Sequence, residues 1–160
     1  MTSPFPRLNI VLHQPEIPGN TGAVGRTCVG INAKLWLVRP LGFRVDEKSL
    51  RRAGLDYWQH LDWEVADHWG DLVDRIGDTR IWFFSRFATR SYAEVEYQTG
   101  DTLVFGSETS GLPEKLTTGN ADHLLRIPTT QNIRSLNLAT SVGVAAFEAV
   151  RQLSAGDLET

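Results

Sequence analysis

Short apolar segments bounded by Gly, Pro, Asn and Asp alternate along this chain with segments of helical period. The apolar segments predict strands at residues 8–12, 35–38, 61–65, 81–84, 103–105 and 124–127. Helices are expected from Asn20 onward, around 47–53, at 69–76, at 113–116 and near the C-terminus. Because buried strands that alternate with helices form parallel sheets, the sequence predicts an α/β fold with a mostly parallel sheet.

The length of 160 residues fits a single domain, residues 1–160, with a core at about 8–153 and a frayed tail at 154–160. The lone cysteine, Cys28, cannot form an internal disulfide, and the four histidines are too scattered for a structural zinc site. No run of about 18 apolar residues occurs, and residues 1–7 do not resemble an export signal. We therefore expect a cytoplasmic protein that is neither exported nor membrane-spanning.

The net charge of −3 conceals an uneven distribution. Residues 1–60 hold eight Lys and Arg against four Asp and Glu, whereas residues 61–125 hold five against twelve. Of the 16 basic residues, 13 are Arg, the side chain best suited to bidentate phosphate contacts. The arginine-rich front is a candidate nucleic-acid surface; the alternative, for Arg51 and Arg52, is a solvated helix face.

Three glycines, Gly19, Gly22 and Gly25, stand at the predicted entrance to the first helix, which Asn20 could cap. Unpaired amides and the helix dipole favour an anion at such a position. The G-x-x-G-x-x-G spacing differs from the G-x-G-x-x-G of dinucleotide-binding folds, although a Rossmann oxidoreductase stays open as an alternative. Arg26 follows, either contacting an anionic ligand or simply solvated.

A second motif occupies residues 103–113, where a strand leads into a loop bracketed by Gly106 and Gly111. The two glycines have the P-loop separation, but Leu112 and Pro113 replace the Lys and Ser or Thr that would hold phosphate and magnesium, which disfavours ATP hydrolysis. Glu108 lies in the middle of this loop. The loop is interpreted either as a ligand-binding segment or as a plain turn.

A third motif, residues 126–138, is a polar loop between the last strand and the last helix. Ser135 is the expected N-cap of that helix, and Asn137 falls inside its first turn. Asn has a poor helix propensity, which a side-chain hydrogen bond to backbone or ligand would explain. Arg134, beside the helix N-terminus, favours an anionic partner.

The last helix carries two apolar faces. One stripe consists of Leu138, Val142, Ala145, Ala149 and Leu153, whereas Val144 and Phe147 fall on another side. The second face indicates that the helix is buried against another subunit as well as against the sheet. A helix buried deep in a single core would explain the pattern equally well.

Taken in this order, the three motifs resemble those of the SPOUT superfamily of RNA methyltransferases, in the branch that methylates the ribose 2′-oxygen. The resemblance is carried by Asn20-Thr21-Gly22 with Arg26, by residues 105–113, and by Ile127-Pro128 through Leu138. The segments 8–18 and 51–57 are similar to those of the short TrmL or YibK type, which acts on the wobble nucleotide of tRNA. The resemblance covers about residues 8–153.

This resemblance implies a C-terminal deep trefoil knot whose loops form a pocket for S-adenosylmethionine, with no metal. It implies an obligate homodimer that uses its terminal helices and binds the tRNA anticodon stem-loop. The donor contacts expected by position are Phe84, Gly106, Ile127 and Ser135, with Glu108 near the pocket.

For the reaction, the resemblance implies methyl transfer to the 2′-oxygen of nucleotide 34, a cytidine or a modified uridine. Arg26, Ser135 and Asn137 are the expected catalytic residues, and Asn20, Arg26 and Arg134 are expected to bind the substrate. In the family that the chain resembles, the arginine of the first motif, here Arg26, is assigned the role of base. Because a guanidinium stays protonated near neutral pH, we expect Arg26 to orient the acceptor instead.

The chain departs from some relatives at Ser107, Ser110 and Gln131, and at Phe147, where they carry tyrosine. These departures concern the acceptor nucleotide more than the donor. The alternatives are methylation of another tRNA position or of ribosomal RNA, and a knotted RNA-binding module without catalytic activity.

Overall fold

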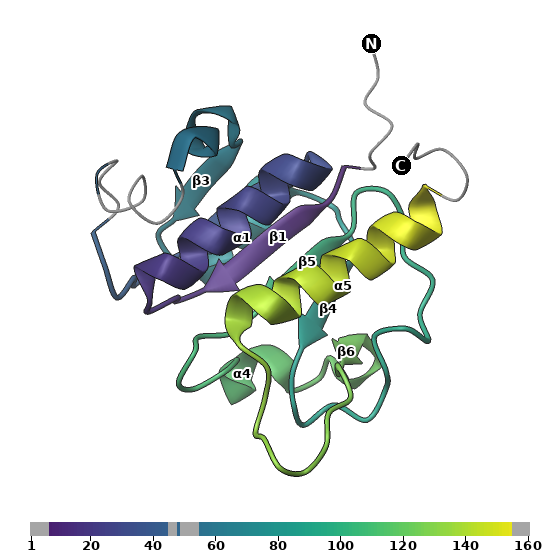
Figure 1. Cartoon of the computed structure of the whole chain (residues 1–160). Helices are drawn as coiled ribbons and strands as arrows, with labels where there is room; N and C mark the ends of the chain where they lie inside the picture. Colours follow the sequence, from purple (N-terminus) through teal and green to yellow (C-terminus); the bar gives the residue numbers. More distant parts are fainter. Residues whose placement is uncertain (1–6, 45–47, 49–54, 155–160) are drawn as a thin grey trace.

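The computed structural model describes residues 7–44, 48 and 55–154, and its centre is one six-stranded sheet (Figure 1). The strands are β1 Asn9–His13, β2 Lys34–Val38, β3 Trp63–Ala66, β4 Ile81–Phe84, β5 Thr102–Phe105 and β6 Leu124–Leu125. Their order is β3-β2-β1-β5-β4-β6, and every pairing is parallel. The predicted α/β fold with a parallel sheet is confirmed.

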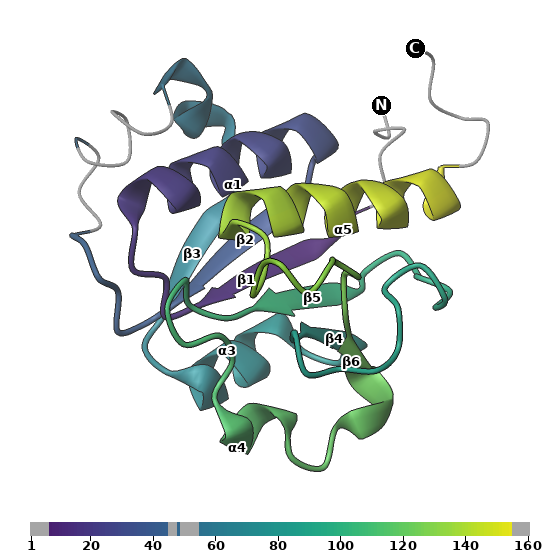
Figure 2. The ribbon, with the colours of Figure 1, turned by 60° about the horizontal axis from the view of Figure 1, so that its bottom comes forward.

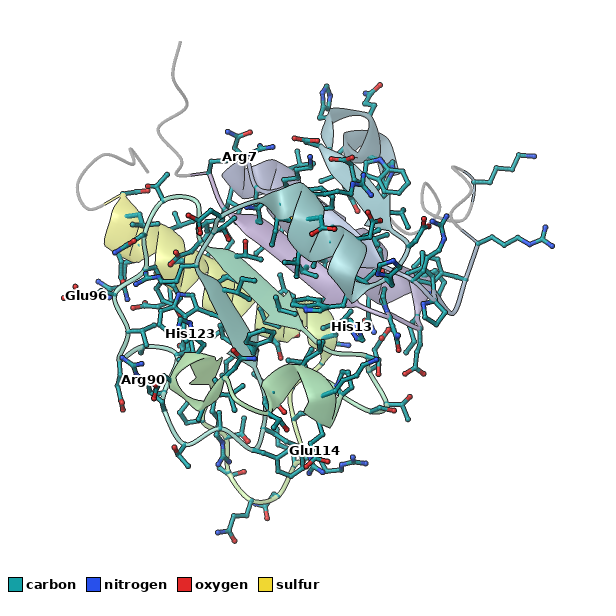
Figure 3. The ribbon with its side chains drawn as sticks, turned by 180° about the vertical axis from the view of Figure 1, so that it is seen from behind. Arg7, His13, Arg90, Glu96, Glu114 and His123 are labelled. Carbon is teal, nitrogen blue, oxygen red and sulfur yellow. The ribbon has the colours of Figure 1, made fainter. Side chains whose placement is uncertain are left out.

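Helices cover both faces of this sheet (Figure 2). On one face α1, Pro18–Ile31, lies beside α5, Leu138–Leu153, and on the other lie α3, Trp69–Ile76, and α4, Glu114–Thr117. Figure 3 views the second face, with Glu114 at the first residue of α4. Two short 3-10 helices, η1 Leu55–His60 and η2 Ala121–His123, complete the described elements.

The alternation of side chains along the strands divides the core into two parts. In β1, Ile10 and Leu12 join the larger apolar cluster with α1 and α5, while Val11 joins the smaller cluster that includes Leu72 of α3. All three β1 residues are fully buried. Strands covered on both faces need apolar residues at successive positions, which explains the uninterrupted apolar runs in the sequence.

Several predicted boundaries differ from the structure. The first helix begins at Pro18 with Ile17 as N-cap, so Asn20 lies inside its first turn and does not cap it. Proline is favoured at the first helical position because its missing N–H would have no partner there. The sixth strand ends at Leu125, so Ile127 lies beyond it in the loop.

Two predictions concern residues near the limits of the described chain. The helix predicted around 47–53 and residues Arg51 and Arg52 lie outside the described residues, apart from position 48. The predicted tail is also outside them from residue 155, but Ser154 itself is buried and donates its N–H to Val150, so fraying does not begin there. No helix in the described part of the chain has the length and apolar character needed to cross a membrane.

Candidate functional site

A hollow of about 430 Å³ lies where β4, β5 and β6 end. Its walls are the segments that follow these strands, together with residues from α1 and the start of α5: 84–87, 105–112, 125–127 and 134–138, with Ile17 and Asn20. The carboxyl ends of parallel strands are where open α/β sheets bind their ligands, and the volume falls in the range of small-molecule pockets. The floor is apolar, because Phe84 and Phe105 stack there with ring centroids 4.6 Å apart.

The loop after β5 folds back tightly on itself. Gly111 donates its N–H to the carbonyl of Ser107 at 3.0 Å, and the backbone of Gly111 has a φ of +66°, which glycine adopts without strain. A Cβ at Gly106 would lie only 2.1 Å from the carbonyl carbon of Gly111. Glycine is therefore required at position 106 by the loop's own backbone, which leaves that backbone directly at the wall of the hollow.

The carboxylate of Glu108 holds the approach to α1. One of its oxygens accepts the Glu16 N–H at 2.9 Å, and the other accepts the Ile17 N–H at 2.7 Å and the Asn20 side-chain amide at 3.2 Å. The sequence predicted an anion at this helix entrance, and the structure shows that a carboxylate of the chain itself occupies it. The glycine-rich segment is not a loop before the helix, because Gly19, Gly22 and Gly25 lie within α1.

Glu16 completes the contact in the reverse direction. Its carboxylate accepts the Thr109 hydroxyl at 2.8 Å and the Thr109 N–H at 3.2 Å. The Thr109 side-chain hydrogen bond is the main reason why the pKa of Glu16 lies below its ordinary value. Each acidic side chain thus binds the backbone beside the other, and we call this reciprocal pair, Glu16 with Glu108, the carboxylate clasp.

Asn137 joins the third motif to the first. Its side-chain amide donates to the Asn20 side-chain oxygen at 3.1 Å, and its own oxygen accepts the Thr140 N–H at 3.2 Å. Asn137 is therefore the N-cap of α5, which corrects the prediction of Ser135 as the cap. The predicted side-chain hydrogen bond of Asn137 to backbone is present, because the cap satisfies a free amide of the first turn.

Arg26 lies apart from this arrangement. It is exposed on α1, and its guanidinium carbon is 5.7 Å from the centroid of the Tyr57 ring. The Tyr57 hydroxyl donates to the Gly22 carbonyl at 2.8 Å, and partial burial raises the pKa of Tyr57 while Arg26 opposes that shift. Arg26 does not line the hollow within this chain.

Gly25 has a packing role. A Cβ at this position would lie 2.5 Å from the ring of Trp58 in η1. The glycine lets the indole pack directly on the helix backbone, so its place in the G-x-x-G-x-x-G pattern reflects core packing.

The structure brings all but one of the predicted site residues to the hollow. Those at its wall are Asn20, Phe84, Gly106, Glu108, Ile127, Arg134, Ser135 and Asn137. Sequence reasoning missed Glu16, Arg86, Phe87 and Arg126. Glu16 lies in a segment flanked by two prolines, and Phe87 follows a predicted strand. The residues that each of them contacts could not be predicted from these positions. Within the described residues, His, Cys, Asp and Glu form no group of three that could hold a metal ion.

The fold and the hollow define a parallel α/β protein with a candidate ligand site built from the loops at its strand ends. The model of the SpoU rRNA methylase family matches residues 7–147, and the chain therefore belongs to this family. A relative from Saccharophagus degradans, named tRNA (cytidine(34)-2′-O)-methyltransferase, is 44% identical over 146 residues, covering 91% of this chain and 95% of the relative.

Solved structures of RNA methyltransferases are similar to this chain over nearly its whole length. One, described as giving structural insights into the 2-OH methylation of C/U34 on tRNA, superposes with a TM-score of 0.90 at 43% identity, covering 96% of this chain and 99% of its own. An AdoMet-bound rRNA methyltransferase from Sinorhizobium meliloti has a TM-score of 0.82 at 25% identity, covering 95% of this chain and 59% of its own.

Proposed function

We propose that this protein transfers a methyl group from S-adenosylmethionine to the ribose 2′-oxygen of nucleotide 34 of tRNA. The observation that carries this proposal is the position of Asn20, whose side chain bonds to both Glu108 and Asn137. One residue thereby connects the three motifs that resemble the methyltransferase branch, beside a hollow of suitable size. The activities named for the relatives support the substrate.

The residues of the hollow fit the methyl donor. Phe84 and Phe105 provide an apolar floor, and Gly106 exposes backbone that can hydrogen-bond an adenine. Ile127 and Ser135 also line the hollow, and Glu108 adds a carboxylate that complements a positively charged sulfonium. The donor, when bound, supplies an electrophilic methyl group and leaves as S-adenosylhomocysteine, the proton of the 2′-hydroxyl passes to solvent, and no metal is needed for the displacement.

The protein's contribution to catalysis is to hold the acceptor oxygen in line with that methyl group. Ser135 and Asn137 are the proposed positioning groups at the wall, and Asn20, Arg26 and Arg134 the proposed contacts to RNA. Arg26 retains its proton, since a guanidinium does not lose it near neutral pH, and it orients the ribose and its phosphate. Arg26 is exposed on α1 and does not line the hollow of its own chain. In this proposal it therefore contacts the part of the RNA that extends out of the hollow, or it acts at the hollow of a second subunit.

A homodimer is part of this proposal. Phe147 on α5 is 54% exposed and Val144 on the same side is half-buried, so α5 has an apolar face that this chain leaves open. A second copy packed on α5 would cover that face. We also propose that the segment leading to α5 passes through the loops as a trefoil knot. Because the proposed substrate is tRNA, we expect the enzyme to act in the cytoplasm.

The decisive experiment incubates the protein with S-adenosylmethionine and tRNA that lacks the modification, followed by mass spectrometry of the nucleosides. One ribose-methylated nucleotide at position 34 is expected. If the enzyme instead acts on another tRNA position or on ribosomal RNA, mapping of the methylated nucleotide identifies that site. Complete absence of product with every RNA, although the donor binds, would overturn the proposal.

A variant pair separates the role of Arg26 in methylation from donor binding. Arg26→Ala is expected to retain donor binding and lose methylation, and Arg26→Lys to recover only part of it, because Lys keeps the charge without the planar fork. If both variants methylate tRNA at the wild-type rate, Arg26 has no role in the reaction.

A further inference from the structure

A second hollow of about 360 Å³ adjoins the first at its mouth. The side chains of Arg86, Phe87, Arg126 and Arg134 line both hollows. The rest of the second hollow is formed by residues 130–133 of the loop between β6 and α5, which projects at the lower edge of Figure 1. The shared residues make this outer hollow continuous with the proposed donor site. Residues 130–133 are all exposed, whereas Phe84 and Phe105 of the first hollow are buried, so the outer hollow lies nearer the surface.

Phe87 is the most exposed large apolar side chain in the described part of the protein, at 77%. A short turn after β4 presents it: Ala88 donates to the carbonyl of Ser85 at 3.2 Å, and Phe87 donates its N–H to the Ser85 hydroxyl, also at 3.2 Å. Ser85 in turn donates to the carbonyl of Leu125 in β6 at 2.9 Å. The ring is thus held outward by a turn anchored to the sheet.

Three arginines line the same hollow as this ring. The guanidinium carbon of Arg86 lies 4.4 Å from the ring centroid of Phe87, within the range of a cation–π contact. Arg86, Arg126 and Arg134 are all exposed, and none forms an ion pair with a carboxylate of the described residues. No Asp or Glu lines the outer hollow. The exposed ring therefore stands in a positive field that the surrounding described residues do not neutralise.

An exposed aromatic ring among unpaired arginines is the combination that binds unpaired nucleotides. A base stacks on the ring with little dependence on its identity, and the arginines bind the flanking phosphates. An apolar protein partner would not need the three charges, and an acidic protein partner would not need the exposed ring.

We propose that Phe87 is a stacking platform for a nucleotide of the RNA adjacent to the one that is methylated, with Arg86 and Arg126 contacting its phosphates. The proposal rests on the proposed function, because it places the target ribose in the inner hollow and the neighbouring nucleotide in the outer one. It implies that the RNA must be unpaired at both positions, as in a loop.

The first test compares Phe87→Leu, which keeps apolar bulk without a ring, with Phe87→Trp, which keeps a stacking surface. Loss of one stacked base is expected to weaken tRNA binding and raise the KM for tRNA about tenfold in the Leu variant, with little change in kcat, and the Trp variant should match the wild type. Val73→Ala removes another exposed apolar side chain, on α3 and outside both hollows, and should change neither value.

The second test measures tRNA binding against salt concentration, in the presence of S-adenosylhomocysteine so that no turnover occurs. Arg86→Gln and Arg126→Gln should each reduce the slope of log K against log salt by about 0.7 to 0.9, one phosphate contact apiece.

The outcomes are distinguishable. If Phe87→Leu weakens donor binding and leaves tRNA binding unchanged, the ring covers the donor and the proposal is wrong; unchanged tRNA affinity in the Leu variant, or unchanged salt slopes, also overturns it. If wild-type protein binds tRNA through Phe87 but methylates no RNA, the methyltransferase function fails while the stacking surface is retained.

Discussion

Two carboxylates bracket β5, Asp101 immediately before it and Glu108 in the loop after it. Asp101 is 2% exposed and accepts hydrogen bonds from the Arg80 guanidinium at 2.8 and 3.1 Å, the Trp82 indole at 3.0 Å and the Gln98 N–H at 2.9 Å. Glu108 is partly exposed and accepts three hydrogen bonds from the segment that enters α1. Both groups accept several hydrogen bonds, but of the two only Glu108 lines the hollow of the candidate site.

The difference lies in what each carboxylate connects. The partners of Asp101 are Arg80 immediately before β4, Trp82 on β4 and Gln98 just before β5, so the group ties together neighbouring segments where these two strands begin. The partners of Glu108 are about 90 residues away in the sequence, so the group joins the loop after β5 to the loop after β1. We infer that Asp101 serves stability, whereas Glu108 serves the shape of the site, and variants can separate the two roles.

The largest effect is expected for Asp101→Ala. It leaves the Arg80 guanidinium, the buried Trp82 N–H and the Gln98 N–H without their acceptor, and each hydrogen bond to a charged group is worth about 1.5–3 kcal/mol. Urea unfolding measures the loss. At urea concentrations below the unfolding transition, the affinity of the folded variant for the donor should equal that of the wild type. A loss of donor affinity under these conditions would show that Asp101, like Glu108, shapes the site.

Glu108→Gln is expected to have an intermediate effect on stability and a larger effect on the site. The amide keeps the shape but can no longer accept hydrogen bonds at both ends, so one backbone N–H of Glu16 or Ile17 faces an NH₂ group, at a cost of about 1–3 kcal/mol. Unfolding measurements and calorimetry with S-adenosylmethionine check this together. A variant with normal donor affinity and normal methylation would show that the carboxylate is only structural.

Asn137→Ala should cost about 1 kcal/mol, because it removes the N-cap of α5 as well as the bond to Asn20. Ser135→Ala is the matched control, since Ser135 is exposed and does not cap the helix. Thermal unfolding of the two variants compares the positions directly. Equal losses would contradict the assignment of Asn137 as the cap, and a loss of methylation in Ser135→Ala without a loss of stability would support its role at the site.

The smallest effect concerns the pH dependence of the carboxylate clasp. The folded state lowers the pKa of Glu16, mainly through the Thr109 hydroxyl, so this contribution to stability is complete above the unfolded pKa of about 4.5 and is lost as the pH falls through the folded value. Thr109→Val should therefore be slightly less stable than wild type at pH 7, with the gap narrowing below pH 4.5. Unfolding curves between pH 3 and 7 check this; a constant gap would exclude Glu16 as the titrating group.

Much of the fold could be predicted because it depends on local pattern. Strands buried on both faces must be apolar at nearly every position, so β1, β2, β4 and β5 stand out in the sequence within one or two residues of their ends. The end of β6 could not be predicted, because it depends on pairing: only Leu124 and Leu125 pair with β4, and Arg126 instead forms a bridge with Ser91.

The helix termini follow the same division. Both Ser135 and Asn137 are good N-caps by type, and the sequence prediction placed Ser135 at the cap and Asn137 inside the first turn. Asn137 is the cap in the structure, where its amide also reaches Asn20 on a different helix. That second bond comes from the packing of α5 beside α1, and no local pattern contains it.

The sequence by itself determined the class of fold, the order of its strands along the chain and the three motifs that line the site, because apolar periodicity, glycine spacing and polar loops are written into consecutive residues. Only the tertiary structure decided that Glu108 occupies the entrance of α1, that Arg26 stands outside the hollow and that Phe87 stands at its mouth. Hydrogen-bond geometry and exposure depend on residues up to 117 positions apart in the sequence, and only the folded chain brings them together.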